Sequence, residues 1–221
     1  RAYGWFKENP NELCDTVRHL TDDTLFQPGA DAIKFFFRRV GVISGFIVNA
    51  EKAKKLSSDL FDGRLYYQMY LAGMLMAEGQ GYYFSDVMTL SRDTEAPDFG
   101  NAGTEKGVFT PGGYKPEGRI HMVEGLLLIA KYIEDTTKID GVYAGIRKDL
   151  ANYFYPYIRD QLDLPLYTYI KMINKFRKMG FSNEKLFYVH AFLGYVLKRR
   201  GYDALIKYIR SKKGGTPRLG I

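Results

Sequence analysis

Most of the short motifs that identify an enzyme family are absent from this sequence. It has no Gly-x-x-x-x-Gly-Lys-Ser/Thr phosphate loop and no Gly-x-Gly-x-x-Gly dinucleotide motif. It also lacks the Cys-x-x-Cys and His-Glu-x-x-His spacings of metal sites and the Gly-x-Ser-x-Gly turn of a serine nucleophile. The histidines are far apart in the chain, and none has the spacing of a metal ligand. These absences disfavour P-loop hydrolysis, a local zinc site and serine hydrolase chemistry.

Cysteine and long apolar runs are also scarce. Cys14 is the only cysteine, so an internal disulfide is excluded, which is typical of a reducing compartment. No apolar run reaches the ~18 residues that a membrane-spanning helix needs, and we expect no secretory signal. The chain begins with Arg1 rather than Met, which predicts a fragment or a processed product. We expect a cytoplasmic location, or a peripheral one at the inner face of the membrane.

Positive charge is concentrated in the second half of the chain. Residues 1–118 carry 13 Lys and Arg against 16 Asp and Glu, whereas residues 119–221 carry 19 against 9. The net charge of +7 therefore comes entirely from the second half, most densely between Lys171 and Lys213. This asymmetry predicts either a polyanionic partner, such as lipid head groups, nucleic acid or phosphates, or a solvated helical face that serves solubility.

The apolar pattern predicts a small α/β region followed by a mainly helical one, and a predominantly helical chain overall. Residues 93–118 contain six glycines and three prolines without any period, which predicts a flexible loop of the kind that covers active sites. Before this loop we predict helices over 11–20, 29–39 and 64–78 and strands over 41–48 and 82–90. After it we predict helices over 119–135, 141–155, 164–179, 182–200 and 202–210.

Aromatic residues alternate with Lys and Arg in the helical region. At helical spacing these rings predict core packing; alternatively, they form an interfacial surface where rings reach head-group depth and cations meet anionic lipid. A nucleic-acid module uses the same residue types, but no RNA-binding aromatic hexamer or zinc finger is present, so nucleic acid is the least favoured partner. The rings are Tyr153, Phe154, Tyr155, Tyr157, Tyr167, Tyr169, Phe176, Phe181, Phe187, Tyr188, Tyr195 and Tyr208.

The segment from Val42 into the loop around Glu105 carries the most specific signal. It reads VISGFIVNAEKA, then FDGRLYYQMYLAG, then GYYFSDVMTLSRD, and it closes with FGNAGTEKG. This order resembles the second half of a bacterial family 2 glycosyltransferase of the GT-A type. The resemblance implies a partial GT-A-like core over 1–92, an active-site loop over 93–118 and a basic helical extension over 119–221.

The resemblance also implies which residues act. It places Ser44-Gly45 near the donor sugar, where the lack of bulk also lets a ligand approach the backbone; the alternative is a tightly packed buried strand. Asp62 is a candidate general base for the acceptor hydroxyl, or only an N-cap of the following helix. Family members commonly carry Glu-Asp where this chain has Tyr-Gln. Gln68 would therefore orient the acceptor, and Asp62 or Asp86 would supply the base.

Charged residues in and beside the loop complete the expected site. Arg92 would neutralise the leaving diphosphate, or it is a surface residue, and Glu105 would contact the donor. His121 would bind a phosphate or a metal, or it is a structural histidine. The resemblance implies Mg²⁺ or Mn²⁺, which the family holds with an Asp-x-Asp motif in its first half. No such motif is visible here, and Asp22-Asp23 is among the nearest imitations.

The sequence therefore predicts a fragment of an inverting glycosyltransferase. Such an enzyme transfers a sugar from a nucleotide-sugar to a glycan or lipid-linked acceptor, and we expect it to act in surface polysaccharide synthesis. The alternative is a non-catalytic basic helical module that docks on an anionic membrane or on a protein partner.

Overall fold

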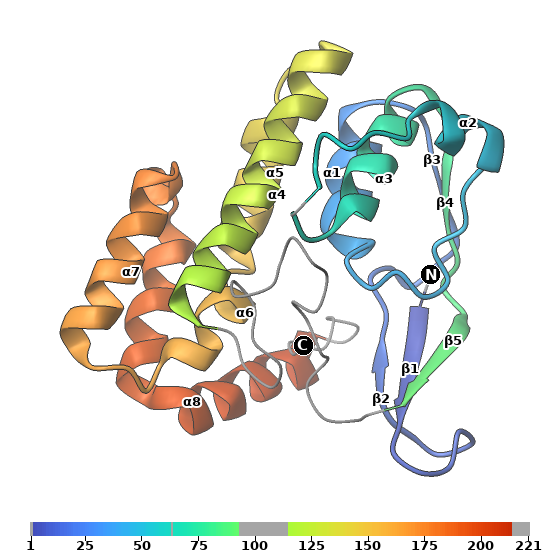
Figure 1. The fold of residues 1–221 in the computed structure, drawn as a ribbon. Coiled ribbons are helices and arrows are strands. Elements are labelled where there is room, and N and C mark those ends of the chain that lie inside the picture. Colours follow the sequence, from blue (N-terminus) through green and yellow to red (C-terminus); the bar gives the residue numbers. More distant parts are fainter. Residues whose placement is uncertain (1, 63, 93–114, 214–221) are drawn as a thin grey trace.

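The computed structural model describes residues 2–62, 64–92 and 115–213 (Figure 1). It confirms the predicted fold class, because an N-terminal region of small sheets and helices precedes a mainly helical region. Glu105 and the other residues of 93–114 lie outside the described residues. The predicted loop over 93–118 is therefore described only at its end, where a helix begins at Pro116.

Two small sheets form the strand part of the N-terminal region. β1 (Ala2–Phe6) is the central strand of the first sheet. It pairs antiparallel with β2 (Leu13–Val17) and parallel with β5 (Val87–Arg92). The second sheet pairs β3 (Thr24–Phe26) antiparallel with β4 (Gly81–Tyr83). Consecutive segments around residue 84 thus belong to different sheets.

Three helices accompany these sheets. α1 (Ala30–Arg39) and α3 (Tyr67–Glu78) lie side by side, and α2 (Ala50–Lys55) is a short helix close to α3 (Figure 1). On α1, Ile33 and Phe37 recur four residues apart and are fully buried, as expected of an amphipathic helix. This confirms the predicted helix over 29–39.

Within residues 115–213, the C-terminal region contains helices and no strands. Lys198 has φ 57°, which breaks the last helix into two segments near the predicted boundary at residue 200. The predicted helices over 119–135, 141–155 and 164–179 are confirmed with small shifts at their ends. The elements are α4 (Pro116–Thr137), α5 (Val142–Asn152), α6 (Tyr155–Ile158), η1 (Arg159–Gln161), α7 (Leu166–Lys178), η2 (Phe181–Asn183) and α8 (Lys185–Lys213).

One apolar core joins the two regions. Phe37 of α1, Val123 of α4 and Ile146 of α5 are buried in the same cluster, which continues to Phe187 of α8. At its edge, Arg38 donates from Nε to Asp149 Oδ2 at 2.8 Å, and so links α1 to α5. Most of the aromatic residues singled out in the sequence belong to this core, which confirms core packing for them; Tyr167, at 79% exposure, is an exception.

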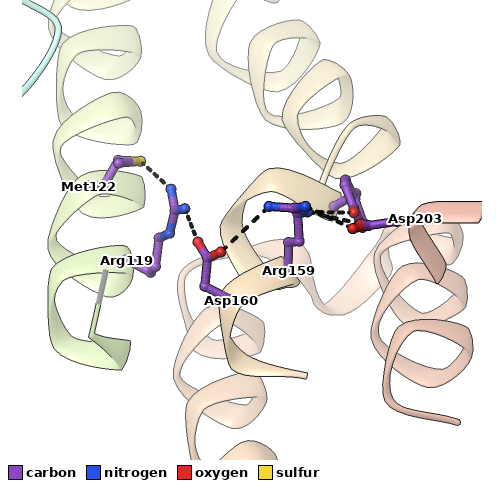
Figure 2. Close-up of polar contacts among 6 residues, drawn as sticks. Arg119, Met122, Arg159, Asp160 and Asp203 are labelled. Carbon is purple, nitrogen blue, oxygen red and sulfur yellow. Dashed lines mark hydrogen bonds and ion pairs between the residues drawn. The ribbon is translucent and has the colours of Figure 1, made fainter. Parts of the chain in front are cut away.

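A chain of ion pairs connects α4, η1 and α8 (Figure 2). Arg119 is only 3% exposed, and its Nη2 donates to Asp160 Oδ2. Arg159 donates to both carboxylate oxygens of Asp203, at 2.9 Å from Nε and 2.7 Å from Nη2. Because guanidinium and carboxylate groups alternate along this chain, the buried Arg119 and the three partly exposed charges each have an opposite charge next to them.

Two secondary-structure predictions are wrong. The segment predicted as a helix over 11–20 contains β2, because Val17 pairs with Tyr3 of β1 and this distant pairing overrides the local pattern. Residues 41–48 were expected to form a buried strand, but they form irregular backbone with a turn at Ser44-Gly45, where Gly45 has φ 75°. Ile43 and Ile47 are 63% and 85% exposed, so this apolar run is not a strand of the core.

Two other predictions are only partly right. The strand predicted over 82–90 is divided into β4 and β5 by residues 84–86. The helix predicted over 64–78 begins at Tyr67, and its N-cap is Tyr66 with φ 71°. Asp62 is therefore not the N-cap of α3. It lies in a preceding turn, where its backbone N–H donates to the Asp59 carbonyl at 2.9 Å.

Candidate functional site

A cavity of about 630 Å³ lies in the N-terminal region and is the candidate site. Its walls come from α1, from the turn at 45–49, from the side of α3 and from the segment between Gly79 and Thr89. These segments are distant in sequence, and the packing of α1 against α3 brings them together. The volume is in the range of pockets that bind small molecules and cofactors.

Aromatic rings form much of the cavity wall. Phe35 and Phe36 of α1 line the cavity, and their rings contact each other edge to face with centroids 5.2 Å apart. Across the cavity lining, Tyr82 and Phe84 lie with their ring centroids 4.7 Å apart, and both are exposed. Exposed rings in a cavity wall offer stacking surfaces to a base or to the apolar face of a sugar.

The charged groups of the lining are all basic. Arg39 and Lys52 line the cavity together with His19, and the lining contains no Asp or Glu among the residues that the structure describes. Asn49 and Gln80 add side-chain amides, which both donate and accept hydrogen bonds. A concave site with cations, amides and rings but no carboxylate favours an anionic ligand with a polar and a ring-shaped part.

Two polar atoms of the lining are buried without a hydrogen-bond partner among the described residues. They are Nε of Arg39 and Oγ1 of Thr89. Burial lowers the pKa of the Arg39 guanidinium, and the neighbouring charge of Arg38 lowers it further, although arginine stays charged at neutral pH. Both atoms are almost inaccessible to solvent, so they lie behind the surface of the cavity and are not contact points for a ligand in it.

One of the residues expected at the donor lines this cavity. Gly45 is in its wall, and the neighbouring Ser44 is exposed. The turn conformation of Gly45 leaves its backbone open, so the alternative of a packed buried strand is wrong for this pair. Asp86 is exposed and is not in the lining. Along the chain it lies two residues from Phe84 and two residues from Met88, and both of these line the cavity.

The other predicted residues have partners elsewhere. Gln68 donates from Nε2 to the Gly41 carbonyl at 3.1 Å, which ties α3 to the turn after α1. His121 lies in α4, where its Nδ1 accepts from Arg64 at 2.9 Å. Arg92 donates from Nε to the Lys7 carbonyl at 3.1 Å at the end of the first sheet. The structure therefore does not bring Gln68, His121 and Arg92 into one site with Gly45.

The described residues do not fit a metal ion. Within residues 2–62, 64–92 and 115–213, no three His, Cys, Asp or Glu side chains gather as a cation site would require. Asp23 has a structural role instead, because its Oδ1 accepts from Ser85 N and Ser85 Oγ, both at 2.8 Å. These hydrogen bonds lower the pKa of Asp23 and hold the segment between β4 and β5 against the end of β3.

Arg39, Lys52 and Thr89 are among the cavity residues that were not predicted from the sequence. Lys52 lies four residues after Val48, within the segment that resembles a glycosyltransferase. The sequence does not show that Lys52 lines the same cavity as Gly45, because this depends on the path of the chain through residues 45–49. Arg39 follows Arg38 at the end of an amphipathic helix, where a basic pair is also expected for the helix dipole. Thr89 has the sequence context of an ordinary strand residue.

Comparison with protein-family models, with curated proteins and with solved structures finds no match to this chain. In the part of the chain that the structure describes, we find no helix with the length and apolarity that crossing a bilayer demands. The functional interpretation therefore depends on the chemistry of the cavity and on the resemblance of the segment around it.

Proposed function

We propose that this chain is part of a nucleotide-sugar-dependent glycosyltransferase and that its cavity binds the diphosphate end of the donor. The observation that carries the proposal is the cavity lining, in which Arg39 and Lys52 stand without any carboxylate among the described residues. A diphosphate supplies the negative charge that this lining lacks, and its oxygens accept hydrogen bonds from both cations. The presence of Gly45 in the wall agrees with the resemblance to family 2 enzymes.

Each part of the lining has a task in this proposal. Arg39 and Lys52 stabilise the negative charge that grows on the diphosphate as it leaves. Asn49 Oδ1 already accepts from the Lys52 N–H and Gln80 Nε2 already donates to Gln27, so the other polar atom of each amide, Asn49 Nδ2 and Gln80 Oε1, is the one that binds sugar or ribose hydroxyls. Tyr82 and Phe84 provide ring faces for stacking. The site then binds the donor through cations that pair with the diphosphate, amides that bind hydroxyl groups and rings that stack on the base or the sugar.

The reaction is an inverting displacement. The acceptor oxygen forms a bond to the anomeric carbon while the bond from that carbon to the diphosphate oxygen breaks, and the diphosphate leaves with the electron pair. We assign Asp86 as the base that takes the proton of the acceptor hydroxyl, because Asp86 is the predicted candidate closest along the chain to the lining. Asp86, Asp62 and Gln68 all lie outside the lining itself.

A divalent cation is not part of this derivation. The resemblance implies Mg²⁺ or Mn²⁺, but the described residues offer no cluster that fits it. The two basic side chains of the lining provide charge neutralisation from this chain's own residues.

Calorimetric titration with UDP and GDP, with and without Mn²⁺, tests the proposal. We expect one nucleotide to bind, and we expect Lys52→Gln to weaken it about 10-fold by removing a charge-assisted contact. Lys54→Gln is the matched control, because Lys54 is on the same short helix but outside the lining. Absence of binding, or equal affinity in both variants, contradicts the proposal.

A further inference from the structure

The outer side of α7 and α8 presents apolar and basic side chains to solvent. We call this the α7–α8 surface. Its apolar members are Leu166, Tyr167, Ile170, Val189, Phe192 and Val196, and its basic members are Lys171, Lys175, Lys178 and Lys185. Phe192 is 68% exposed and belongs to this group of exposed apolar side chains; it is the group, rather than any single residue, that marks an interaction surface.

On α8 the exposed apolar residues form a stripe. Val189, Phe192 and Val196 follow at spacings of three and four, so they lie on one face of the helix. The buried residues Phe187 and Ala191 lie on the opposite face, against the core. α8 is therefore apolar on two sides, and only one of them is covered by the described residues.

α7 also has exposed apolar side chains and lies next to α8. Tyr169 of α7 stacks on Tyr195 of α8 at 4.7 Å and donates to the Ala191 carbonyl at 2.8 Å, so the two helices are packed together. Leu166 and Ile170 of α7 are exposed one turn apart, and lysines follow them along the helix.

The charge of this segment is almost entirely of one sign. Residues 165–213 contain 12 Lys and Arg against two acidic residues. Both acids are engaged with arginines of other elements: Glu184 with Arg147 at 3.5 Å, and Asp203 with Arg159 at 2.7 Å. Among the described residues, no carboxylate is paired with the lysines of the α7–α8 surface.

We infer that the α7–α8 surface docks on an anionic lipid bilayer. Exposed aliphatic and aromatic side chains enter the head-group region, and lysines around them meet lipid phosphates. This combination distinguishes a bilayer from other polyanions, because a nucleic acid binds lysines without needing Val189, Phe192 and Val196 exposed. The inference goes beyond the proposed function and uses none of the residues of the cavity.

Vesicle flotation of the whole chain tests this inference. We expect binding to vesicles of phosphatidylcholine with phosphatidylglycerol, and little binding to phosphatidylcholine alone. Raising the salt from about 0.1 M to about 1 M weakens it, because screening shortens the Debye length from about 10 Å to about 3 Å. The triple substitution Lys171→Gln, Lys175→Gln, Lys178→Gln lowers affinity about 100-fold, and Phe192→Ser with Val196→Ser lowers it about 10-fold.

Matched controls separate the surface from general charge and apolarity. Lys7→Gln, Lys54→Gln, Lys55→Gln removes the same charge elsewhere, and Leu128→Ser removes an exposed apolar side chain of α4; neither changes vesicle binding. Nucleotide affinity stays unchanged in the α7–α8 variants, so failure here is distinct from failure of the proposed function.

Three outcomes overturn the inference. One is equal binding to neutral and anionic vesicles. Another is binding to an oligonucleotide instead of vesicles, lost in the lysine variant. The third is a wild-type dimer in light scattering that Phe192→Ser converts to a monomer, which identifies the surface as a contact between copies.

Discussion

The guanidinium of Arg39 lies over the ring of Phe35, with Cζ 4.3 Å from the ring centroid. Its Nη1 donates to the Phe35 carbonyl at 2.8 Å, and Phe35 itself stacks on Phe26 with centroids 4.4 Å apart. The helix and the aromatic stack therefore hold this cation beside the cavity before any ligand arrives. A preorganised cation loses little conformational entropy on binding, which favours affinity for an anion.

Thr89→Val tests whether the buried, unpartnered hydroxyl of Thr89 destabilises the folded chain. Removing the unpartnered hydroxyl should raise the free energy of unfolding by about 1 kcal/mol, because a buried unsatisfied group is destabilising. Nucleotide affinity should stay unchanged, because the hydroxyl is buried behind the surface of the cavity. Denaturant unfolding and calorimetry measure stability and affinity, and Thr89→Ser, which keeps the hydroxyl, is the control. A Thr89→Val protein that is less stable than the wild type would count against the interpretation.

Arg119→Met tests the ion-pair chain between α4 and η1. The substitution removes the buried partner of Asp160, which keeps only the longer contact with Arg159 at 3.8 Å, and we expect a loss of about 2 kcal/mol in the free energy of unfolding. The double variant Arg119→Met, Asp160→Leu removes both charges and should recover much of that loss. Equal stability of the single variant and the wild type would show that this pair contributes nothing.

His190 gives the stability of the chain a pH dependence. Its Nδ1 lies 2.6 Å from the Tyr202 hydroxyl and its Nε2 3.1 Å from the Asn152 carbonyl. Burial lowers the pKa of His190, which the hydrogen bond to Asn152 offsets only in part. The unfolded chain therefore takes up a proton at higher pH than the folded chain, and stability decreases as the pH falls below about 6.5.

The comparison that checks this sign uses His190→Gln. Its free energy of unfolding should change less than that of the wild type between about pH 7 and about pH 5. Denaturant titrations at several pH values measure it. A wild-type protein that becomes more stable over this fall in pH, with a flat His190→Gln profile, has the opposite sign and rejects the assignment.

The sequence predicted the helices better than the strands, for a physical reason. The core faces of α1, α4 and α7 show in the sequence because helical periodicity is local. β2 was missed because the pairing of Val17 with Tyr3 depends on a strand that its own residues do not specify. The apolar run at 41–48 was wrongly predicted as a strand because a buried strand and an exposed apolar turn contain the same residue types. In the structure, Gly45 has the positive φ of a turn, which a strand residue does not adopt.

The candidate site was predictable only in part. Gly45 was expected near the donor and lines the cavity, and this expectation came from a resemblance rather than from spacing. Arg39, Lys52 and Thr89 belong to a helix, a second helix and a strand, and they share a cavity only because α1 packs on α3. No local pattern predicts such a meeting of distant segments.

Amide NMR of the whole chain, titrated with UDP and with GDP, tests the central claim most directly. If the cavity binds the donor diphosphate, the amide signals of Gly45, Lys52 and Thr89 shift, and those of Val189 and Phe192 on the α7–α8 surface do not. Shifts confined to the α7–α8 surface, or no shift with either nucleotide, would contradict the assignment of this cavity as the donor site.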